Sequence, residues 1–234
     1  PALGPVAGGT SVTLSGTKLP STVRQPLCVF LAGGGGGTLE EVADGGARLV
    51  AARWIGPSAV ECVAPALPEG LHGVALSFNG GHSRSSPATA ADGALLTFEA
   101  LKPLVVHSIL PECGPIGGGS TLLVTGAHFP RRAFALGLLA CRFGERLAPA
   151  RWLNGSALTC VAPAGRQGTH ALEVTSNLRD FSNSGLYFRY HSYALSELAP
   201  TAGPVAGGTL RRIGVHLGCP SALHCRFGDG LDDA

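Results

Sequence analysis

The sequence contains no methionine, few aromatic residues and little charge. Among its 234 residues, 6% are aromatic and 14% are charged, and lysine occurs only at Lys18 and Lys102. Lysine and arginine number 17 against 15 acids, so the net charge of +2 favours neither nucleic acid nor an anionic membrane as a partner. An aromatic platform for binding sugars also has few residues to draw on.

Long hydrophobic runs and helical periodicity are missing too. The longest apolar run, at 133–141, is less than half of the ~20 residues that a membrane helix needs, so no membrane contact is expected within this stretch. The chain begins with neither a charged leader nor an apolar signal segment, which predicts an internal piece of a longer protein. No segment keeps a helical period over three turns.

Catalytic and metal-binding patterns are absent from the sequence. No serine lies in a G-x-S-x-G motif, the acids are dispersed, and the eight histidines form no His-x-His or His-x₃-His pair. Asp229, Asp232 and Asp233 gather near the C-terminal end, where fraying is a better explanation than calcium binding. We therefore expect no enzymatic activity, no metal site and no cofactor.

What the sequence does contain is an internal repeat. The segment GPVAGGT at 4–10 returns at 203–209, and a looser copy, GPIGGGS, lies at 114–120. A second segment recurs between the first two copies, since ARWIGPSAVECVAPA at 52–66 matches ARWLNGSALTCVAPA at 150–164. The histidine pairs His72 and His170, and His128 and His216, also hold equivalent positions, so the repeat explains them before any metal does.

Within each copy the apolar residues alternate with a period of two. Short segments at 73–78, 121–126, 157–162 and 171–176 are bounded by glycine or proline and are rich in valine, leucine, threonine and phenylalanine. This pattern is typical of half-buried strands, and a series of them predicts antiparallel β-sandwiches.

The repeated glycine motif resembles a phosphate-binding loop only superficially. Such a loop needs Lys-Ser/Thr directly after its last glycine, whereas Ser11 and Val12 follow Thr10 here, at the start of a predicted strand rather than a helix. We interpret the motif as a turn in which proline fixes φ and glycines take positive φ. The predicted turn residues are Gly4, Pro5, Gly8, Gly9, Gly114, Pro115, Gly118, Gly119, Gly203, Pro204, Gly207 and Gly208.

The combined pattern P-x-x-GP-x-x-GG-T, G-x-x-F, C-x-F-G and C-x-x-P resembles the IPT/TIG domain. This resemblance implies an all-β fold of tandem immunoglobulin-like (E-set type) sandwiches, as in plexin-type and fibrocystin-type proteins and some transcription factors. It predicts domain 1 at 1–100, domain 2 at 101–190, and the start of a truncated third domain at 191–234. Domain 1 departs from the pattern, because CVFL replaces CRFG and a glycine-rich insertion, Gly33–Gly46, follows it.

Four of the seven cysteines recur at matching places in the repeats. Cys28 and Cys141 open the C-x-F segment, and Cys62 and Cys160 lie in the C-x-AP segment. Because disulfide cysteines tend to recur in this way, we predict the pairs Cys28–Cys62 and Cys141–Cys160 and an oxidising compartment.

The remaining cysteines are less regular. We expect Cys113 near the junction of domains 1 and 2 and Cys219 near the next junction, too far apart to bond to each other. Cys219 could close on Cys225, or Cys225 could pair beyond Ala234. Cys113 would then be a free thiol or an intermolecular staple.

Two further positions stand out. Asn154-Gly155-Ser156 is the one N-glycosylation sequon, and it falls in a predicted turn where a glycan would be tolerated, although the tripeptide could equally go unused. The two tryptophans, Trp54 and Trp152, hold equivalent positions ahead of a cysteine and are predicted to pack in the core near a disulfide.

Three functions fit the resemblance. The first is a structural or adhesive repeat of an extracellular or cell-surface protein, a rigid spacer or scaffold that contacts copies of itself, other proteins or further domains of its own chain, in a filament if it polymerises. The second is the stalk of a plexin-like receptor. The third, a DNA-binding or dimerising domain of a transcription factor, lacks the clustered lysine and arginine that phosphate contacts need. The first is favoured.

Overall fold

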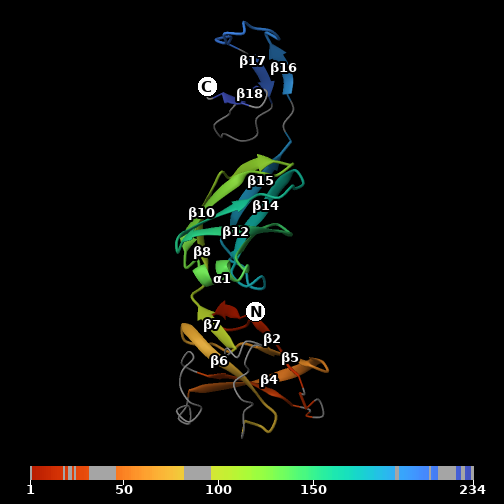
Figure 1. The fold of residues 1–234 in the computed structure, drawn as a ribbon, viewed down its shortest axis with the longest axis vertical. Helices are drawn as coiled ribbons and strands as arrows, with labels where there is room; N and C mark the ends of the chain where they lie inside the picture. The colour runs from red at the N-terminus through yellow and green to blue at the C-terminus, as the bar shows by residue number, and fades with distance from the viewer. Residues whose placement is uncertain are drawn as a thin grey trace.

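The structure is a computed structural model. It describes residues 2–17, 19–20, 23, 25–31, 46–81, 96–192, 195–210, 212–215, 225–227 and 230–232. Figure 1 shows two β-sandwiches placed end to end along the longest axis, with a further pair of strands beyond the second. Almost all of the Gly33–Gly46 insertion lies outside the described residues.

The first sandwich contains seven strands in the order β1-β7-β6-β3-β4-β5-β2. The long strand β4 is shared, because its first half pairs with β3 and its second half with β5. The strands therefore close around one core instead of forming a flat sheet. Their bounds are β1 (Leu3–Pro5), β2 (Ser11–Ser15), β3 (Leu27–Leu31), β4 (Ala47–Gly56), β5 (Ala59–Val63), β6 (Gly70–Ser77) and β7 (Thr97–Leu101).

The second sandwich repeats this arrangement with one additional strand at its edge, in the order β8-β10-β13-β12-β11-β14-β15-β9. The added strand is β8, which precedes the GP motif and pairs antiparallel with β10. The elements are β8 (Val105–Leu110), β9 (Cys113–Pro115), β10 (Thr121–Ala127), α1 (Arg131–Ala135), β11 (Ala140–Phe143), β12 (Arg146–Asn154), β13 (Ala157–Val161), β14 (Gly168–Thr175) and β15 (Leu186–His191).

The C-terminal segment forms two short antiparallel pairs. The strand β16 (Leu195–Ala199) pairs with β17 (Arg212–Val215), and β18 (Cys225–Phe227) pairs with β19 (Gly230–Asp232). The described elements thus confirm the predicted all-β class, with α1 as the single helix among them.

Equivalent aromatic residues fill the two cores. Phe30 and Phe98 meet edge to face with ring centroids 5.6 Å apart, and Phe143 and Phe188 do the same at 5.4 Å. All four rings are buried. The alternation of apolar residues read from the sequence therefore corresponds to the inward faces of these strands.

The tryptophans pack against the cores without being fully inside them. Both are partly buried, and each indole N–H donates to a backbone carbonyl, Trp54 to Val23 at 2.8 Å and Trp152 to Phe129 at 2.9 Å. The polar end of the indole holds each ring at the rim of the core that contains the disulfide cysteines, which agrees with the predicted packing near a disulfide.

Both predicted disulfide bonds are present. Cys28–Cys62 joins β3 to β5, and Cys141–Cys160 joins β11 to β13, with Cα atoms 6.4 Å and 6.3 Å apart. In each sandwich the bonded strands lie on opposite sides of the shared strand, β4 or β12, so the bond ties the two halves of the core together.

Candidate functional site at the junction of the two sandwiches

The linker between the sandwiches is short and packs against the second one. Only Lys102, Pro103 and Leu104 separate β7 from β8. Leu104, and Leu101 at the end of β7, pack against the core of the second sandwich. The linker therefore forms part of the interface.

Leu3 carries the apolar contact across the junction. Its backbone belongs to the first sandwich, because β1 pairs parallel with β7 in the register Leu3↔Glu99. Its side chain is fully buried and belongs to the core cluster of the second sandwich. One sandwich thus contributes a side chain to the core of the other.

A polar loop of the second sandwich, between β14 and β15, faces Leu3. Asn177 organises this loop, since its Oδ1 accepts hydrogen bonds from the backbone N–H groups of Arg179 and Asp180 at 2.9 Å and 2.8 Å. The hydroxyl of Thr175 accepts a further bond from the N–H of Leu178 at 2.9 Å. The loop is therefore fixed by its own side chains, as is typical of Asx turns.

The same loop bonds to the first sandwich. The Asn177 Nδ2 donates to the backbone carbonyl of Leu3 at 3.0 Å and to Asp180 at 2.7 Å. The hydroxyl of Thr10, at the end of the GPVAGGT motif, donates to the same Asp180 carboxylate at 2.5 Å. The bond from Asn177 to Leu3 is buried and the two bonds to Asp180 are partly buried, so these bonds are largely shielded from water and fix the relative position of the two sandwiches.

Two further contacts flank the linker. Arg132 of α1 reaches back to β7, with its guanidinium 3.2 Å from the Glu99 carboxylate and 3.4 Å from the Thr97 hydroxyl. His128 Nδ1 lies 3.0 Å from the carbonyl of Pro103. The Arg132–Glu99 pair is partly exposed, so it contributes little energy and serves mainly to fix orientation.

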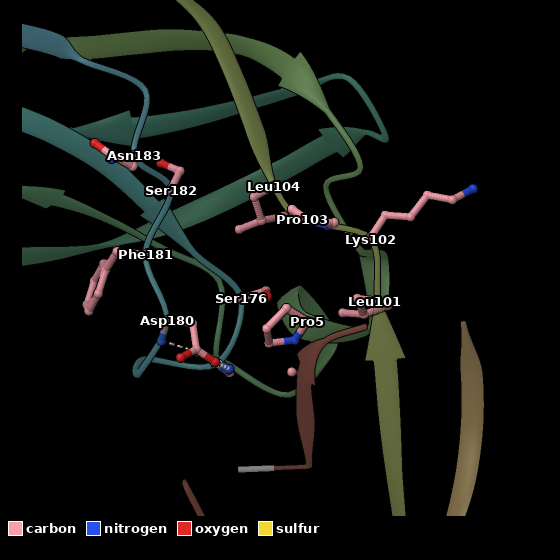
Figure 2. A pocket seen from close by; sticks show the side chains of 12 residues that line it. Pro5, Leu101, Lys102, Pro103, Leu104, Ser176, Asp180, Phe181, Ser182 and Asn183 are labelled. Carbon is pink, nitrogen blue, oxygen red and sulfur yellow. Dashed lines mark hydrogen bonds between the residues drawn. The ribbon is translucent and has the colours of Figure 1, made fainter. Parts of the chain in front are cut away.

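A groove runs along the junction between these contacts. Pro5 and Leu101 line it from the first sandwich, Pro103 from the linker, and Asp180 and Phe181 from the polar loop. Figure 2 shows Lys102 pointing away from Asp180, so the linker does not place its cation against the loop carboxylate. The groove contains no set of groups arranged for bond cleavage.

The electrostatic environment of Glu61 also involves both sandwiches. The hydroxyl of Ser11 donates to Glu61 Oε1 at 2.6 Å, and Arg53 donates to Oε2. These bonds hold the pKa of Glu61 below its usual value, the Ser11 hydroxyl having the larger effect and Arg53 the next. Arg179, from the loop of the second sandwich, lowers this pKa further by its charge.

We expect the first sandwich to lose stability in acid through this carboxylate. A folded-state pKa below the unfolded value stabilises the protein above about pH 4.5, and this contribution is lost as the pH falls through the lowered pKa. NMR titration of the Glu61 side chain should show a midpoint below 4.5 that rises in Arg179→Ala. If Arg179→Ala left the midpoint of Glu61 unchanged, the close approach of the β14–β15 loop to Glu61 would be contradicted. The variant Glu61→Gln should lose less stability in acid than the parent chain, because it lacks this carboxylate.

The family model for the IPT/TIG domain matches this chain twice, at residues 1–91 and 104–190. The chain belongs to the IPT/TIG family. Fibrocystin-L of Mus musculus is 33% identical over 72 residues, which cover 31% of this chain and 2% of that protein. The chain thus spans a very small part of this curated relative.

Two structures of the plexin A4 extracellular region resemble the chain in fold. One shares 17% identity at a TM-score of 0.46, covering 100% of this chain and 21% of the plexin. The other shares 15% identity at a TM-score of 0.41, covering 91% of this chain and 27% of the plexin. The two matches of the family model confirm the IPT/TIG resemblance read from the sequence.

The structure corrects the interpretation of Cys113. This residue begins β9, which pairs with Arg189–His191 at the end of β15, so it lies at the junction with the C-terminal segment and not at the junction with the first sandwich. The predicted position of Cys113 was wrong because β8 comes before it in the chain. This strand carries the chain from the linker to the opposite end of the sandwich.

Cys113 is also disulfide-bonded, so the interpretations as a free thiol and as an intermolecular staple are both wrong. The predictions for Cys219 and for the side chain of Cys225 fall outside the described residues.

The other predicted positions fall in the first two IPT/TIG units as follows. His72 and His170 each place Nε2 near the carbonyl of the residue four positions earlier, at 2.8 Å and 2.9 Å, which gives both a structural role. Asn154 is exposed in the β12–β13 turn, and its Oδ1 accepts bonds from the N–H and hydroxyl of Ser156.

No group of three metal-binding side chains occurs within the described ranges. Their only helix, α1, is far too short to cross a membrane.

Sequence reasoning missed the residues that make the junction. None of the four residues Leu3, Arg132, Asn177 and Asp180 was singled out from the sequence, and Asp180 and Arg132 belong to none of the repeated motifs. One signal was available: Asn177 is the repeat equivalent of Asn79, and in both loops a hydroxyl two residues earlier bonds to the asparagine Oδ1, Thr175 in one and Ser77 in the other.

Proposed function

We propose that this IPT/TIG segment is a non-enzymatic structural repeat of an extracellular or cell-surface protein and acts as a rigid spacer. The observation that carries the proposal is the insertion of Leu3 of the first sandwich into the core of the second. Neighbouring domains in one chain move relative to each other by default, unless their interface is extensive and apolar. A shared core residue is the kind of contact that opposes such motion.

Polar contacts support the same role. Thr10 and Asn177 donate hydrogen bonds across the junction. Arg132 contacts Glu99 of β7, and His128 contacts Pro103 of the linker. These contacts surround the short linker, so a hinge motion would have to break several of them at once. A spacer of this kind transmits orientation and force between the parts of the protein on either side.

The disulfide bonds support an extracellular location. Both sandwiches carry a disulfide bond at the equivalent position, and such bonds persist in oxidising compartments. In that setting the exposed Asn154 would be available for N-glycosylation. The partners of a spacer are other proteins, whether copies of itself or further domains of its own chain.

We also propose that residues 191–234 begin a third unit. The pair β16–β17 occupies the place that β8–β10 has in the second unit, before and after the GP motif. Gly207 and Gly208 take positive φ values of 82° and 81°, close to those of Gly118 and Gly119 at 77° and 88°. The repeat would then be continuous along the chain, as a spacer requires.

The proposal is tested by replacing Leu3 with alanine. We expect Leu3→Ala to destabilise the second sandwich by about 2 kcal/mol, the lower end for a buried leucine, because the cavity opens towards the junction. The first sandwich, which contains the residue in its sheet, should change less. Chemical denaturation followed by Trp152 fluorescence, in a Trp54→Phe background, reports the second sandwich alone.

The Leu3→Ala variant needs a control at an exposed leucine, and the relative orientation of the two sandwiches is measured separately. Leu71, which is exposed on β6 of the first sandwich, provides the matched control Leu71→Ala. Residual dipolar couplings should show one shared alignment for both sandwiches in the parent chain and two separate alignments in Leu3→Ala/Asn177→Ala. Separate alignments already in the parent chain would overturn the rigid spacer.

A further inference from the structure

The turn between β12 and β13 contains an asparagine followed by a glycine. Asn154 and Gly155 are both exposed, and the turn is tight, since Asn154 pairs directly with Ala157. Gly155 has no side chain to shield its backbone nitrogen, and a Cβ added there would meet no atom within 4 Å. The backbone nitrogen of Gly155 is therefore free to approach the side chain that precedes it, and such an intramolecular attack is favoured by proximity.

The side-chain amide of Asn154 is held by Ser156. Its Oδ1 accepts hydrogen bonds from the N–H and from the hydroxyl of Ser156, each at 2.9 Å. Two donors at one carbonyl oxygen stabilise negative charge that develops there, as in an oxyanion hole. Among the described residues, neither Asn154 Nδ2 nor the N–H of Gly155 has a hydrogen-bond partner. The oxygen is thus fixed while the two nitrogens are unrestrained.

The equivalent turn of the first sandwich lacks this asparagine. The sequence GPS at 56–58 stands where NGS stands at 154–156. In both turns the carbonyl of the serine accepts a hydrogen bond from a glycine N–H, Gly16 in the first sandwich and Gly126 in the second. The hairpin therefore forms without an asparagine, and Asn154 gives the second turn a reactivity that the first does not have.

We propose that Asn154 is a site of spontaneous deamidation. The backbone nitrogen of Gly155 loses its proton to water and attacks Cγ of Asn154, so that an N–Cγ bond forms and the carbonyl electron pair moves onto Oδ1. The Cγ–Nδ2 bond then breaks, and Nδ2 takes up a proton and leaves as ammonia. Water opens the resulting cyclic imide at Cγ to give aspartate, or at the backbone carbonyl carbon to give isoaspartate. N-glycosylation of Nδ2 would consume the same nitrogen and block this reaction.

The isoaspartate product would act on the junction of the two sandwiches. It lengthens the main chain by one carbon in a turn where the carbonyl of Gly155 accepts from the N–H of Phe129 at 2.9 Å. The preceding residue, His128, has a φ of 64° and places Nδ1 3.0 Å from the carbonyl of Pro103 in the linker. Displacement of Phe129 would therefore weaken a contact with the linker. This consequence rests on the proposed rigid spacer, whereas the reaction itself does not.

The reaction is tested by incubating the unglycosylated 234-residue chain at neutral pH and following its tryptic peptides by mass spectrometry. We expect peptide 152–166 to gain the mass of one amide-to-acid conversion, as aspartate and isoaspartate. Peptide 167–179 should keep its asparagine, because Asn177 is buried and its Nδ2 is hydrogen-bonded.

Variants at Ser156 test the role of its hydroxyl. In the folded chain, Ser156→Ala should slow the conversion about tenfold, because it removes one hydrogen bond to a developing charge. Ser156→Thr, which keeps the hydroxyl, should convert at the parent rate. In the free peptide of residues 152–166, where the turn is not formed, Ser156→Ala should have no such effect. Equal rates for Ser156→Ala and the parent in the folded chain would contradict the oxyanion-like arrangement.

The turn of the first sandwich supplies the matched control. Asn154→Gly/Gly155→Pro should fold and show no change in mass. In the converted parent chain, but not in this control, hydrogen exchange of the Phe129 amide should become faster. A folded chain that keeps Asn154 under conditions that convert the free peptide would overturn the proposal, because the turn would then protect the amide. Conversion with unchanged exchange at Phe129 would overturn the effect on the junction and leave the modification site standing.

Discussion

Replacing Gly118 with alanine is expected to destabilise the second sandwich by about 4 kcal/mol. A left-handed backbone alone costs an L residue about 1–2 kcal/mol, and overpacking adds about 1–3 kcal/mol. At Gly118 both costs apply, since φ is 77° and an added Cβ would lie 2.6 Å from the backbone of Ala162 and Pro163.

The neighbouring Gly119 provides a matched control. Its φ of 88° is equally unfavourable for alanine, but an added Cβ meets no atom within 4 Å. Gly119→Ala should therefore show the backbone cost alone, about 1–2 kcal/mol. Urea denaturation of both variants, followed by Trp152 fluorescence, measures the difference. Equal losses would show that strand β10 can shift to make room and that close packing of the motif against the Ala162 turn is unimportant.

Much of the fold was readable from the sequence because the deciding interactions are local or repeated. A period of two over each strand predicts which face is buried, and residues such as Phe98 and Phe188 lie where that period places them. The turn was predictable because only glycine suits the backbone at Gly118 and Gly119. The pairs Cys28–Cys62 and Cys141–Cys160 followed from recurrence in two copies.

The junction was not readable because it depends on how two folded units meet. Nothing in the neighbourhood of Leu3 distinguishes a side chain directed into its own core from one directed into the next. Asn177 and Asp180 looked like ordinary turn residues, and only their bonds to Leu3 and Thr10 give them a wider role. Cys113 was misplaced for a related reason, since its position depends on the strand order and not on its distance along the chain.

Removal of a disulfide bond should have an effect of similar size, and the two bonds should differ in a predictable order. In the chain-entropy model, closing a loop across a separation of 34 residues at Cys28–Cys62 stabilises by about 4 kcal/mol, and across 19 at Cys141–Cys160 by about 3 kcal/mol. All four cysteines are buried, so alanine replacement in pairs also removes some packing, by similar amounts in the two sandwiches.

The double variants Cys28→Ala/Cys62→Ala and Cys141→Ala/Cys160→Ala separate these contributions. Each should lower the stability of its own sandwich, reported by Trp54 or Trp152 in the background that lacks the other tryptophan, while the partner sandwich changes little. A reducing agent should reproduce the loss of the first sandwich in the parent chain, and it should cause no further loss of that sandwich in Cys28→Ala/Cys62→Ala. A larger effect at Cys141–Cys160 would contradict the loop-length argument, because the two bonds occupy equivalent places in equivalent cores and differ chiefly in the loop that they close.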